Sequence, residues 1–198
     1  MSARSGILLA LLAAGQSRRF GDPDKLSALL GDKMLGLHAA ETAAAMPFAG
    51  KLAIGSPAHD CAPQWRELGY DMIENPEALE GQASSVRIAA AHALDSGAAA
   101  LCVLLADMPF VTAEHLGQLI RAFERSGETV ASARGGQVMP PAIFPAETLE
   151  QLLALEGDTG ARAVLASAER ITGNDPLLID VDTREDLARA NIIYNRIR

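Results

Sequence analysis

The chain has 198 residues, which suits one domain and is too short for two full ones. Apolar residues make up 49% and aromatic residues only 4%, so a core must come mainly from Ala, Leu, Val and Ile. The formal net charge is −8, from 17 Lys and Arg against 25 Asp and Glu. An acidic chain without a block of Lys and Arg is a poor candidate for binding nucleic acid through its phosphates. We therefore expect one domain over residues 1–198 and no nucleic-acid partner.

Two further protein classes are disfavoured by the sequence. Cys61 and Cys102 are too few for a disulfide framework and lack metal-ligand spacing, and the four histidines form no His-x-x-x-His pair. No run of 18 apolar residues occurs, so no membrane partner is expected. The apolar run from Ile7 to Ala14 resembles the core of a signal peptide, but it is short and leads into a polar, Arg-containing segment. A cytoplasmic protein is the favoured prediction.

Stretches typical of strands and helices alternate along the chain, which predicts an α/β fold with a mainly parallel sheet. The continuous apolar runs suit strands that are buried on both faces, and Thr112 suits a helix N-cap. The expected strands are Ile7–Leu12, Lys51–Ile54, Tyr70–Ile73, Ala99–Ala106, Glu128–Ser132, Ala142–Phe144 and Leu177–Val181. The expected helices are Met34–Met46, Gln64–Leu68, Gln82–Ser96, a helix from Thr112 through Phe123, Ala146–Leu155, Ala161–Ala168 and Arg184–Ile197.

A loop of small and basic residues follows the first expected strand. Small residues at positions 13–15 let backbone N–H groups approach an anion, and Arg18, Arg19 and Lys25 supply positive charge beside them. The spacing of the P-loop, the dinucleotide fingerprint and the nucleophile elbow is absent. The loop is therefore predicted to hold phosphates in another way. A solvated basic loop without a ligand is the alternative.

Two sets of carboxylates follow expected strands. Asp107 comes directly after the strand that ends at Ala106, the position of a metal ligand at the carboxyl edge of a sheet, and Mg²⁺ takes few protein carboxylates. A carboxylate that caps the turn is the alternative for Asp107. Asp180 and Asp182 follow on one side of the last expected strand, with Asp182 nearer its end. An N-cap for the helix that begins near Arg184 is the alternative for Asp182.

Two polar turns precede expected helices. Gly81 to Arg87 offers backbone amides, the hydroxyls of Ser84 and Ser85, and the guanidinium of Arg87 at a helix N-terminus, which suits a nucleotide. An ordinary capped helix start is the alternative. The second polar turn runs from Gly157 to Arg162.

Together these segments resemble the molybdenum cofactor cytidylyltransferase-like nucleotidyltransferases, within the family related to molybdopterin nucleotidyltransferases. The resemblance extends from Leu12 to Leu187, and its strongest element is the loop from Leu12 to Lys25. The supporting elements, in family order, are residues 81–87, 106–109, 157–162 and 180–186. It implies a single-domain, Rossmann-like three-layer sandwich of the nucleotide-diphospho-sugar transferase type.

The resemblance also implies a reaction, which is the transfer of CMP from CTP, with Mg²⁺, onto the phosphate of molybdopterin with release of pyrophosphate. Ala14, where guanylyl-transferring relatives carry Gly, favours CTP. By matching position the catalytic residues would be Lys25, Arg19 and Asp107, and the metal ligands Asp107 and Asp182. The nucleotide-binding residues would be Leu12, Ala13, Ala14, Gly15, Ser17, Arg19, Lys25, Gly81, Ser84, Ser85 and Arg87.

Several alternatives stay open at this point. The same reaction could use GTP, or a sugar or polyol phosphate as acceptor. A nucleotide-binding accessory protein that delivers the cofactor to a molybdoenzyme, or works with its chaperone, belongs to a different class. A plain α/β interaction module would require the phosphate loop to be a coincidence. The sequence lacks a Ser/His pair or a His pair for general-base catalysis, which suits an acceptor phosphate that is already largely ionised at pH 7.

Overall fold

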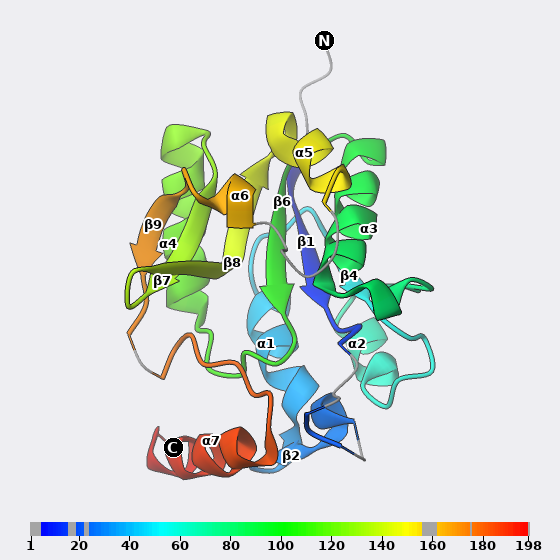
Figure 1. Cartoon of the computed structure of the whole chain (residues 1–198), viewed down its shortest axis with the longest axis vertical. Helices are drawn as coiled ribbons and strands as arrows, with labels where there is room; N and C mark the ends of the chain where they lie inside the picture. Colours follow the sequence, from blue (N-terminus) through cyan, green and yellow to red (C-terminus); the bar gives the residue numbers. More distant parts are fainter. Residues whose placement is uncertain (1–4, 16–18, 22–23, 156–161, 175, 198) are drawn as a thin grey trace.

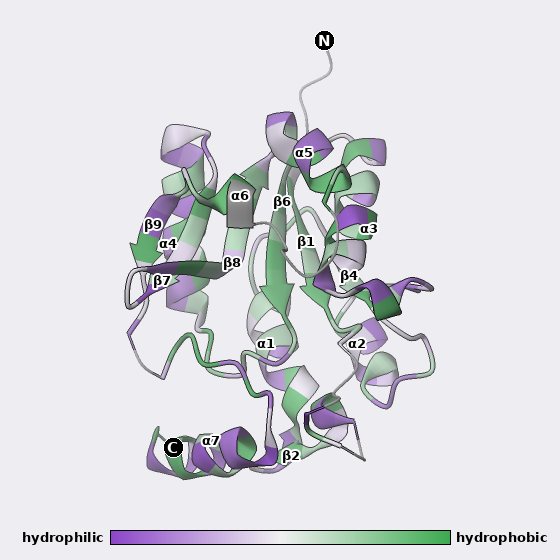
Figure 2. Cartoon of the chain, viewed as in Figure 1, coloured by the Kyte–Doolittle hydropathy of each residue, from purple (hydrophilic) through white to green (hydrophobic). Residues whose placement is uncertain are grey.

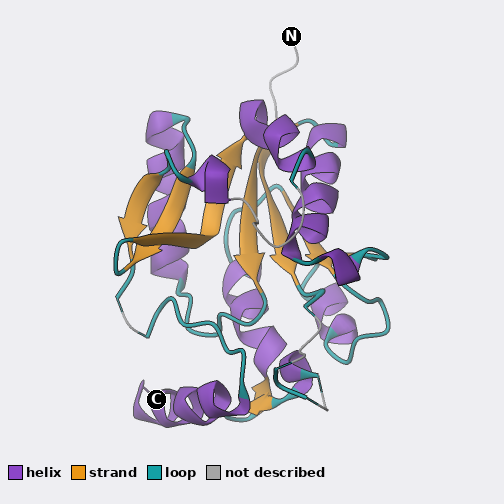
Figure 3. Cartoon of the chain, in the orientation of Figure 1, coloured by secondary structure: helices purple, strands orange, loops and turns teal. Residues whose placement is uncertain are grey.

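A seven-stranded sheet runs through the centre of the computed structural model, with helices on both of its faces (Figures 1 and 3). The structure describes residues 5–15, 19–21, 24–155, 162–174 and 176–197. The strands of the sheet are β1 (Ser5–Leu12), β4 (Gly50–Ile54), β5 (Asp71–Ile73), β6 (Ala98–Leu105), β7 (Val130–Arg134), β8 (Gln137–Pro145) and β9 (Glu169–Thr172). A two-stranded hairpin is formed by β2 (Leu29–Leu30) and β3 (Lys33–Met34).

Helices pack on both faces of the sheet as a three-layer sandwich requires, and the last helix lies beyond one end of the sheet (Figure 1). They are α1 (Leu35–Ala44), α2 (Ala62–Glu67), α3 (Gln82–Asp95), α4 (Ala113–Ser126), α5 (Leu149–Leu153), α6 (Arg162–Leu165) and α7 (Arg184–Ile197). Short 3₁₀ turns are η1 (Lys25–Ser27), η2 (Ala78–Glu80) and η3 (Ala146–Thr148).

The strand order is β5-β4-β1-β6-β8-β7-β9. The strands β5, β4, β1 and β6 are parallel to one another. β8 is antiparallel to both of its neighbours, and β9 is parallel to β7. The predicted α/β fold with a mainly parallel sheet is confirmed. The chain leaves β1 toward β4 and β5 and then returns to its other side as β6, so the carboxyl ends of β1 and β6 form a switch point, where ligands bind in open sheets.

Alternate side chains of β1 supply two separate cores. Ile7, Leu9 and Leu11 pack with α1, α2 and α4, whereas the residues between them pack with α3, α5 and α6. Both faces are therefore dry, which is why β1 and β6 are apolar at almost every position, as Figure 2 shows for the central strands. Small side chains, such as the buried Ala89, Ala90 and Ala93 of α3, let the helix lie close to the sheet.

One predicted strand was wrong. Residues 177–181 form a turn and an extended segment that pairs with no strand of the sheet, and the last strand is β9. Leu178 and Val181 are buried by packing against the core, and the backbone N–H of Val181 donates to the carbonyl oxygen of Asp107 at 3.0 Å. The segment is apolar because it covers one end of the core. The sequence of β9 is more polar because it lies at the sheet edge.

The C-terminal helix α7 lies across the β2–β3 hairpin, at the opposite end of the molecule from the start of β1 (Figure 1). The side chain of Asn191 accepts a hydrogen bond from the backbone of Gly31 at 3.0 Å, and the Tyr194 hydroxyl contacts Asp32 at 3.1 Å. Gly31 has φ +65°, and a Cβ there would meet the Tyr194 ring at 2.1 Å. This close approach requires glycine. None of the described helices is long and apolar enough to cross a membrane.

Candidate active site

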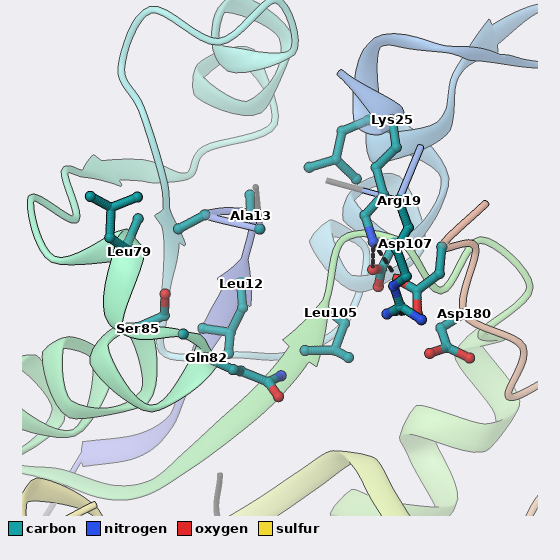
Figure 4. Close-up of a pocket in the computed structure, with 16 residues that line it drawn as sticks. Leu12, Ala13, Arg19, Lys25, Leu79, Gln82, Ser85, Leu105, Asp107 and Asp180 are labelled. Carbon is teal, nitrogen blue, oxygen red and sulfur yellow. Dashed lines mark hydrogen bonds and ion pairs between the residues drawn. The ribbon is translucent and has the colours of Figure 1, made fainter. Parts of the chain in front are cut away.

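A cavity of about 460 Å³ opens at the carboxyl ends of β1 and β6 (Figure 4). The end of β1 and the residues after it, Leu12 to Gly15, form its floor between two different ends. Lys25, Arg19 and the carboxylates Asp107, Asp180 and Asp182 line what we call the charged end. Ala78, Leu79, Gly81, Gln82 and Ser85 line what we call the neutral end. The two ends face one another across the tip of β1 (Figure 4).

Lys25 is the centre of the charged end. Its Nζ donates to Oδ2 of Asp107 at 2.5 Å and to Oδ1 of Asp182 at 2.9 Å, and Arg19 donates to the other oxygen of Asp182 at 2.7 Å. The Lys25 residue is only 7% exposed. Burial lowers the pKa of Lys25, but the charges and hydrogen bonds of Asp107 and then Asp182 raise it by more, so its pKa lies above the usual value. Lys25 is therefore a permanent cation at this position.

Three local structures hold these side chains in place. Asp24 caps η1 by accepting from the backbone of Leu26 at 2.9 Å, which fixes the first residue of that turn, Lys25. Asp107 lies in the turn that follows β6, with one residue, Ala106, between it and the strand. Thr183 and Asp186 bond to each other in both directions, Thr183 Oγ1 to Asp186 at 2.7 Å and the Asp186 backbone to Thr183 at 3.1 Å. This pattern is a capping box for α7, with Asp in the position usual for Glu.

The capping box answers a question that the sequence left open for Asp182. The cap of α7 is made by Thr183 and Asp186, and the carboxylate of Asp182 bonds Lys25 and Arg19 instead. Asp182 therefore belongs to the cavity.

The neutral end is built around the start of α3. Asn75 donates through Nδ2 to the hydroxyls of Ser84 and Ser85, at 2.9 Å each, and is itself buried. Gly81 enters the helix with φ 93° and ψ −170°, a conformation open to glycine almost alone. These contacts leave Gln82 and Ser85 facing the cavity at the far side from Lys25 (Figure 4).

The match to known proteins is decisive at the family level. The MobA-like NTP transferase domain matches residues 9–171, more than half of the chain and both ends of the cavity except for Asp180 and Asp182. The chain belongs to this family. The resemblance drawn from the sequence is confirmed, and the MobA-like domain is a nucleotidyltransferase.

Relatives of the MobA-like domain match over nearly the full chain. Purine catabolism protein PucB of Bacillus subtilis is 30% identical over 201 residues, which cover 92% of this chain and 95% of that protein. A molybdenum cofactor guanylyltransferase of Cereibacter sphaeroides is also 30% identical, over 94% of this chain and 96% of its own. A nucleotidyl transferase from Methanothermobacter thermautotroptrophicus superimposes with a TM-score of 0.81 at 15% identity, covering 98% of this chain and 99% of that one. That structure shows the same fold.

The structure of this MobA-like domain brings most of the predicted site residues together. Those that line the cavity are Leu12, Ala13, Ala14, Gly15, Arg19, Lys25, Gly81, Ser85, Asp107 and Asp182. Ser17 lies outside the described residues, as do residues 157–161 of the second polar turn. The assignment of roles to these residues stays a prediction.

Ser84 and Arg87 are not among the described residues that line the cavity. The Ser84 hydroxyl is fully buried and donates to the carbonyl oxygen of Gly81 at 2.8 Å. Arg87 Nη2 donates to Glu77 at 3.0 Å and Glu80 at 2.6 Å, and Nη1 donates to the carbonyl oxygen of Leu155 at 2.9 Å. Both side chains hold the wall of the neutral end instead of facing into it.

Four residues that matter to this MobA-like site were not assigned to it from the sequence: Asn75, Leu79, Gln82 and Asp180. Asp180 had been weighed against Asp182, and Gln82 lay within the polar turn from Gly81 to Arg87. Asn75 precedes a proline, a pattern of turns, which could have marked it as an anchor. Leu79 carries no such signal because its role depends on where η2 lies.

The charged end fits a divalent cation. Oδ1 of Asp107 is buried, and no described residue donates a hydrogen bond to it. Oδ2 of Asp107 and Oδ1 of Asp182 both accept from Lys25 Nζ, so the two carboxylates converge on one position. Within the described parts of the chain, no three His, Cys, Asp or Glu side chains form a metal cage. Two carboxylates with open positions suit Mg²⁺, which completes its shell with water and substrate phosphates.

Proposed function

We propose that this nucleotidyltransferase transfers CMP from CTP onto the phosphate of molybdopterin, with release of pyrophosphate and with Mg²⁺ as cofactor. The observation that carries the proposal is the division of one cavity into a charged end at Lys25 and a neutral end at Gly81 to Ser85. A nucleoside triphosphate has the same division. The relative named molybdenum cofactor guanylyltransferase supports the acceptor, because it matches over 94% of this chain.

The triphosphate belongs at the charged end in this proposal. Gly15 has no side chain, and among the described residues no atom beyond its chain neighbours lies within 4 Å of where a Cβ would be, which suits an approach by phosphate. Lys25 and Arg19 supply two cations there. Fixed charges in a partly buried site stabilise charge that develops during reaction more than they would in water.

Mg²⁺ would be held by Asp107 and Asp182, and it would neutralise phosphate charge on the nucleotide. Asp180 lies at the same end of the cavity and adds to the negative potential that attracts a cation.

The transfer needs alignment more than proton chemistry. An oxygen of the acceptor phosphate, which is mostly dianionic at pH 7, bonds to the α-phosphorus while the bond from that phosphorus to the bridging oxygen breaks. Pyrophosphate leaves with the bonding electrons. Lys25 and Arg19, which line the charged end, would neutralise that leaving group, and the floor at Leu12 to Gly15 would orient the nucleotide.

The neutral end supports CTP. Cytosine offers an exocyclic amine donor and ring acceptors, which match the carbonyl and amine of Gln82 and the hydroxyl of Ser85. The methyl group of Ala14 lines the cavity and reduces the space for a larger base. GTP is the second candidate, since one relative is named a guanylyltransferase. Ala14→Gly should then move the preference toward GTP.

The first test is thermal stabilisation by CTP, GTP, ATP and UTP, each with and without Mg²⁺. Binding raises the melting temperature by mass action. We expect the largest shift with CTP and Mg²⁺, followed by pyrophosphate release when molybdopterin is added. A larger shift with GTP would replace CTP by GTP in the proposal. Binding without pyrophosphate release from any phosphorylated acceptor would favour a non-catalytic accessory protein for molybdoenzyme maturation.

A further inference from the structure

The rim of the neutral end is formed by residues 75–81, which we call the lip. The lip contains η2, and Leu79 is at its tip. Leu79 is 78% exposed, the most exposed of the large apolar side chains described, yet it lines the cavity. Figure 4 shows it above Ser85, on the side away from Lys25. An apolar side chain held in water at the mouth of a polar cavity is free to cover a flat ligand.

Both ends of the lip are tied to α3. At its start, Asn75 donates to the hydroxyls of Ser84 and Ser85 and accepts from the backbone of Glu77 at 2.9 Å. At its far end, Gly81 accepts from Ser84 at 2.8 Å. These bonds hold the two ends of the lip against α3. The position of η2, between those ends, depends on other contacts.

Arg87 supplies a further connection between the lip and α3. From α3 it bonds the carboxylates of Glu77 and Glu80, one on each side of Leu79, and also the carbonyl oxygen of Leu155, two residues beyond α5. Without the guanidinium, the two carboxylates would repel each other and this connection between η2 and α3 would be lost. A single fork of donors therefore connects three segments around the tip of the lip.

We propose that Leu79 is a nucleotide-binding residue that covers one face of the base, and that Arg87 is a positioning residue that acts through Leu79. The inference rests on the proposed function, because it needs the base at the neutral end. Covering an aromatic face removes apolar surface of Leu79 from water. Holding the lip in place beforehand lowers the ordering cost of binding.

The first experiment compares Leu79→Ala with Leu153→Ala, a partly exposed leucine of α5 outside the cavity lining. Affinity for CTP with Mg²⁺ is measured by calorimetry, and KM and kcat by pyrophosphate release. We expect Leu79→Ala to weaken CTP binding and raise its KM by about 5- to 20-fold, with kcat within about twofold. Leu153→Ala should match the wild type. An unchanged affinity in Leu79→Ala would overturn the proposal.

Inorganic tripolyphosphate separates a lost base contact from a damaged fold. It has the charges of the triphosphate and no base, so it engages the charged end alone. Leu79→Ala should bind it as the wild type does. A parallel loss of tripolyphosphate and CTP affinity would mean that Leu79 supports the structure of the site, which contradicts the proposal.

The positioning role of Arg87 is tested with a double-mutant cycle. Arg87→Ala should raise the KM for CTP by about 3- to 10-fold with little change in kcat, and Arg87→Lys should be intermediate, because an ammonium cannot reproduce the fork. Arg125→Ala is the matched control, since Arg125 makes a surface ion pair with Glu169. If Arg87 acts through Leu79, the double variant is no weaker than Leu79→Ala alone.

Two outcomes would count against the positioning role of Arg87. Additive losses in the double variant, or a fall in kcat for Arg87→Ala, would give Arg87 a role of its own. The proposed function fails in a different way, because wild-type protein would then bind tripolyphosphate but show no added affinity for any nucleotide. Normal CTP binding by both wild type and Leu79→Ala would reject the lip and leave the proposed function standing.

Discussion

At the residue scale, the charge of Lys25 is balanced within the protein. Its buried ammonium lies 2.5 Å from Asp107 and 2.9 Å from Asp182, so its positive charge is already paired with carboxylates in the absence of a ligand. In the proposed function, the same ammonium would also face the triphosphate at the charged end of the cavity. Because oriented electrostatic donors are often worth two to three orders of magnitude in rate, this one side chain is the most sensitive point of the proposed reaction.

Lys25→Ala is expected to lower kcat for pyrophosphate release by roughly 100- to 1000-fold. The physical reason is the loss of an oriented cation beside the leaving group. Lys33→Ala is the control, since Lys33 pairs with Glu41 on α1, away from the cavity. Near-normal turnover in Lys25→Ala would remove Lys25 from the catalytic role.

Lys25→Met is expected to bind Mn²⁺ more tightly than the wild type when no nucleotide is present. Lys25 Nζ bonds one oxygen of each carboxylate that the proposal assigns to the metal, so ammonium and metal compete for them. The free Mn²⁺ signal in electron paramagnetic resonance measures this affinity without any turnover. The same affinity in both proteins would show that the metal lies elsewhere.

The cavity residues could be predicted from the sequence only in part. Three local patterns could be read from the sequence: the small residues after β1, the lysine in the loop that follows them, and the carboxylate after β6. The structure brings them to one cavity. The bond from Lys25 to Asp107 joins residues 82 positions apart, and no local pattern shows it. Arg87 was predicted to bind the nucleotide, but its guanidinium already bonds Glu77, Glu80 and the carbonyl oxygen of Leu155.

At the element scale, the capping box of α7 links helix stability to the site. Thr183→Ala should lower the free energy of unfolding by about 1 kcal/mol, because the helix loses a cap. Urea unfolding measures the loss, and Thr183→Ser, which keeps the hydroxyl, should recover most of it. Equal loss in both variants would mean that the methyl group of Thr183 and not the cap is responsible.

His115, in the first turn of α4, makes stability depend on pH. It is buried, its Nε2 lies 2.8 Å from the hydroxyl of Ser132, and burial lowers its pKa below the usual 6.5. The unfolded chain therefore takes up a proton at a higher pH than the folded one. Its contribution to stability is present above about pH 6.5 and is lost as the pH falls toward the folded pKa.

We expect urea unfolding between pH 5 and pH 7.5 to show this decline in the wild type and a flatter profile in His115→Gln. His92→Gln, on α3, serves as the control and should keep the wild-type slope. An unchanged slope in His115→Gln would assign the acid sensitivity to other groups.

The prediction was accurate for strands that are buried on both faces and for helices that bury one face against the sheet. β1, β6 and α3 lie within two residues of their predicted ends, and Thr112 caps α4 by accepting from His115 as expected. The failure at residues 177–181 has a physical cause, since an apolar segment can cover the end of a core without joining the sheet. A run of apolar residues indicates burial, and a buried segment need not pair with a strand.

At the scale of the whole molecule, the parallel half of the sheet followed from the alternation of strands and helices. The other half did not. β8 lies between β6 and β7, so the later strand is nearer the centre, and β9 closes the edge. That order depends on contacts between distant segments, such as the pairing of Leu101 with Phe144, which no window of local sequence contains.

The docking of α7 joins the C-terminal helix to the loop that follows β1. Arg184, its first residue, donates to the carbonyl oxygen of Phe20 at 3.2 Å and lies over the Phe20 ring, while Asp182 just before it bonds Lys25 and Arg19. Any ligand that requires the loop in this position also requires the helix. By linkage, such a ligand lowers the population in which α7 is detached by the factor 1 + [L]/Kd.

The tail of the chain should consequently act as a reporter of the pocket. Trypsin cuts after exposed arginine once a helix opens, and Arg189 lies midway along α7 with a side chain that is 77% exposed. Cleavage there should slow in proportion to bound CTP and Mg²⁺, whereas cleavage at Arg125, on α4, should not. A simple gel would then follow ligand binding at a cavity whose described lining carries no aromatic side chain to serve as an optical probe.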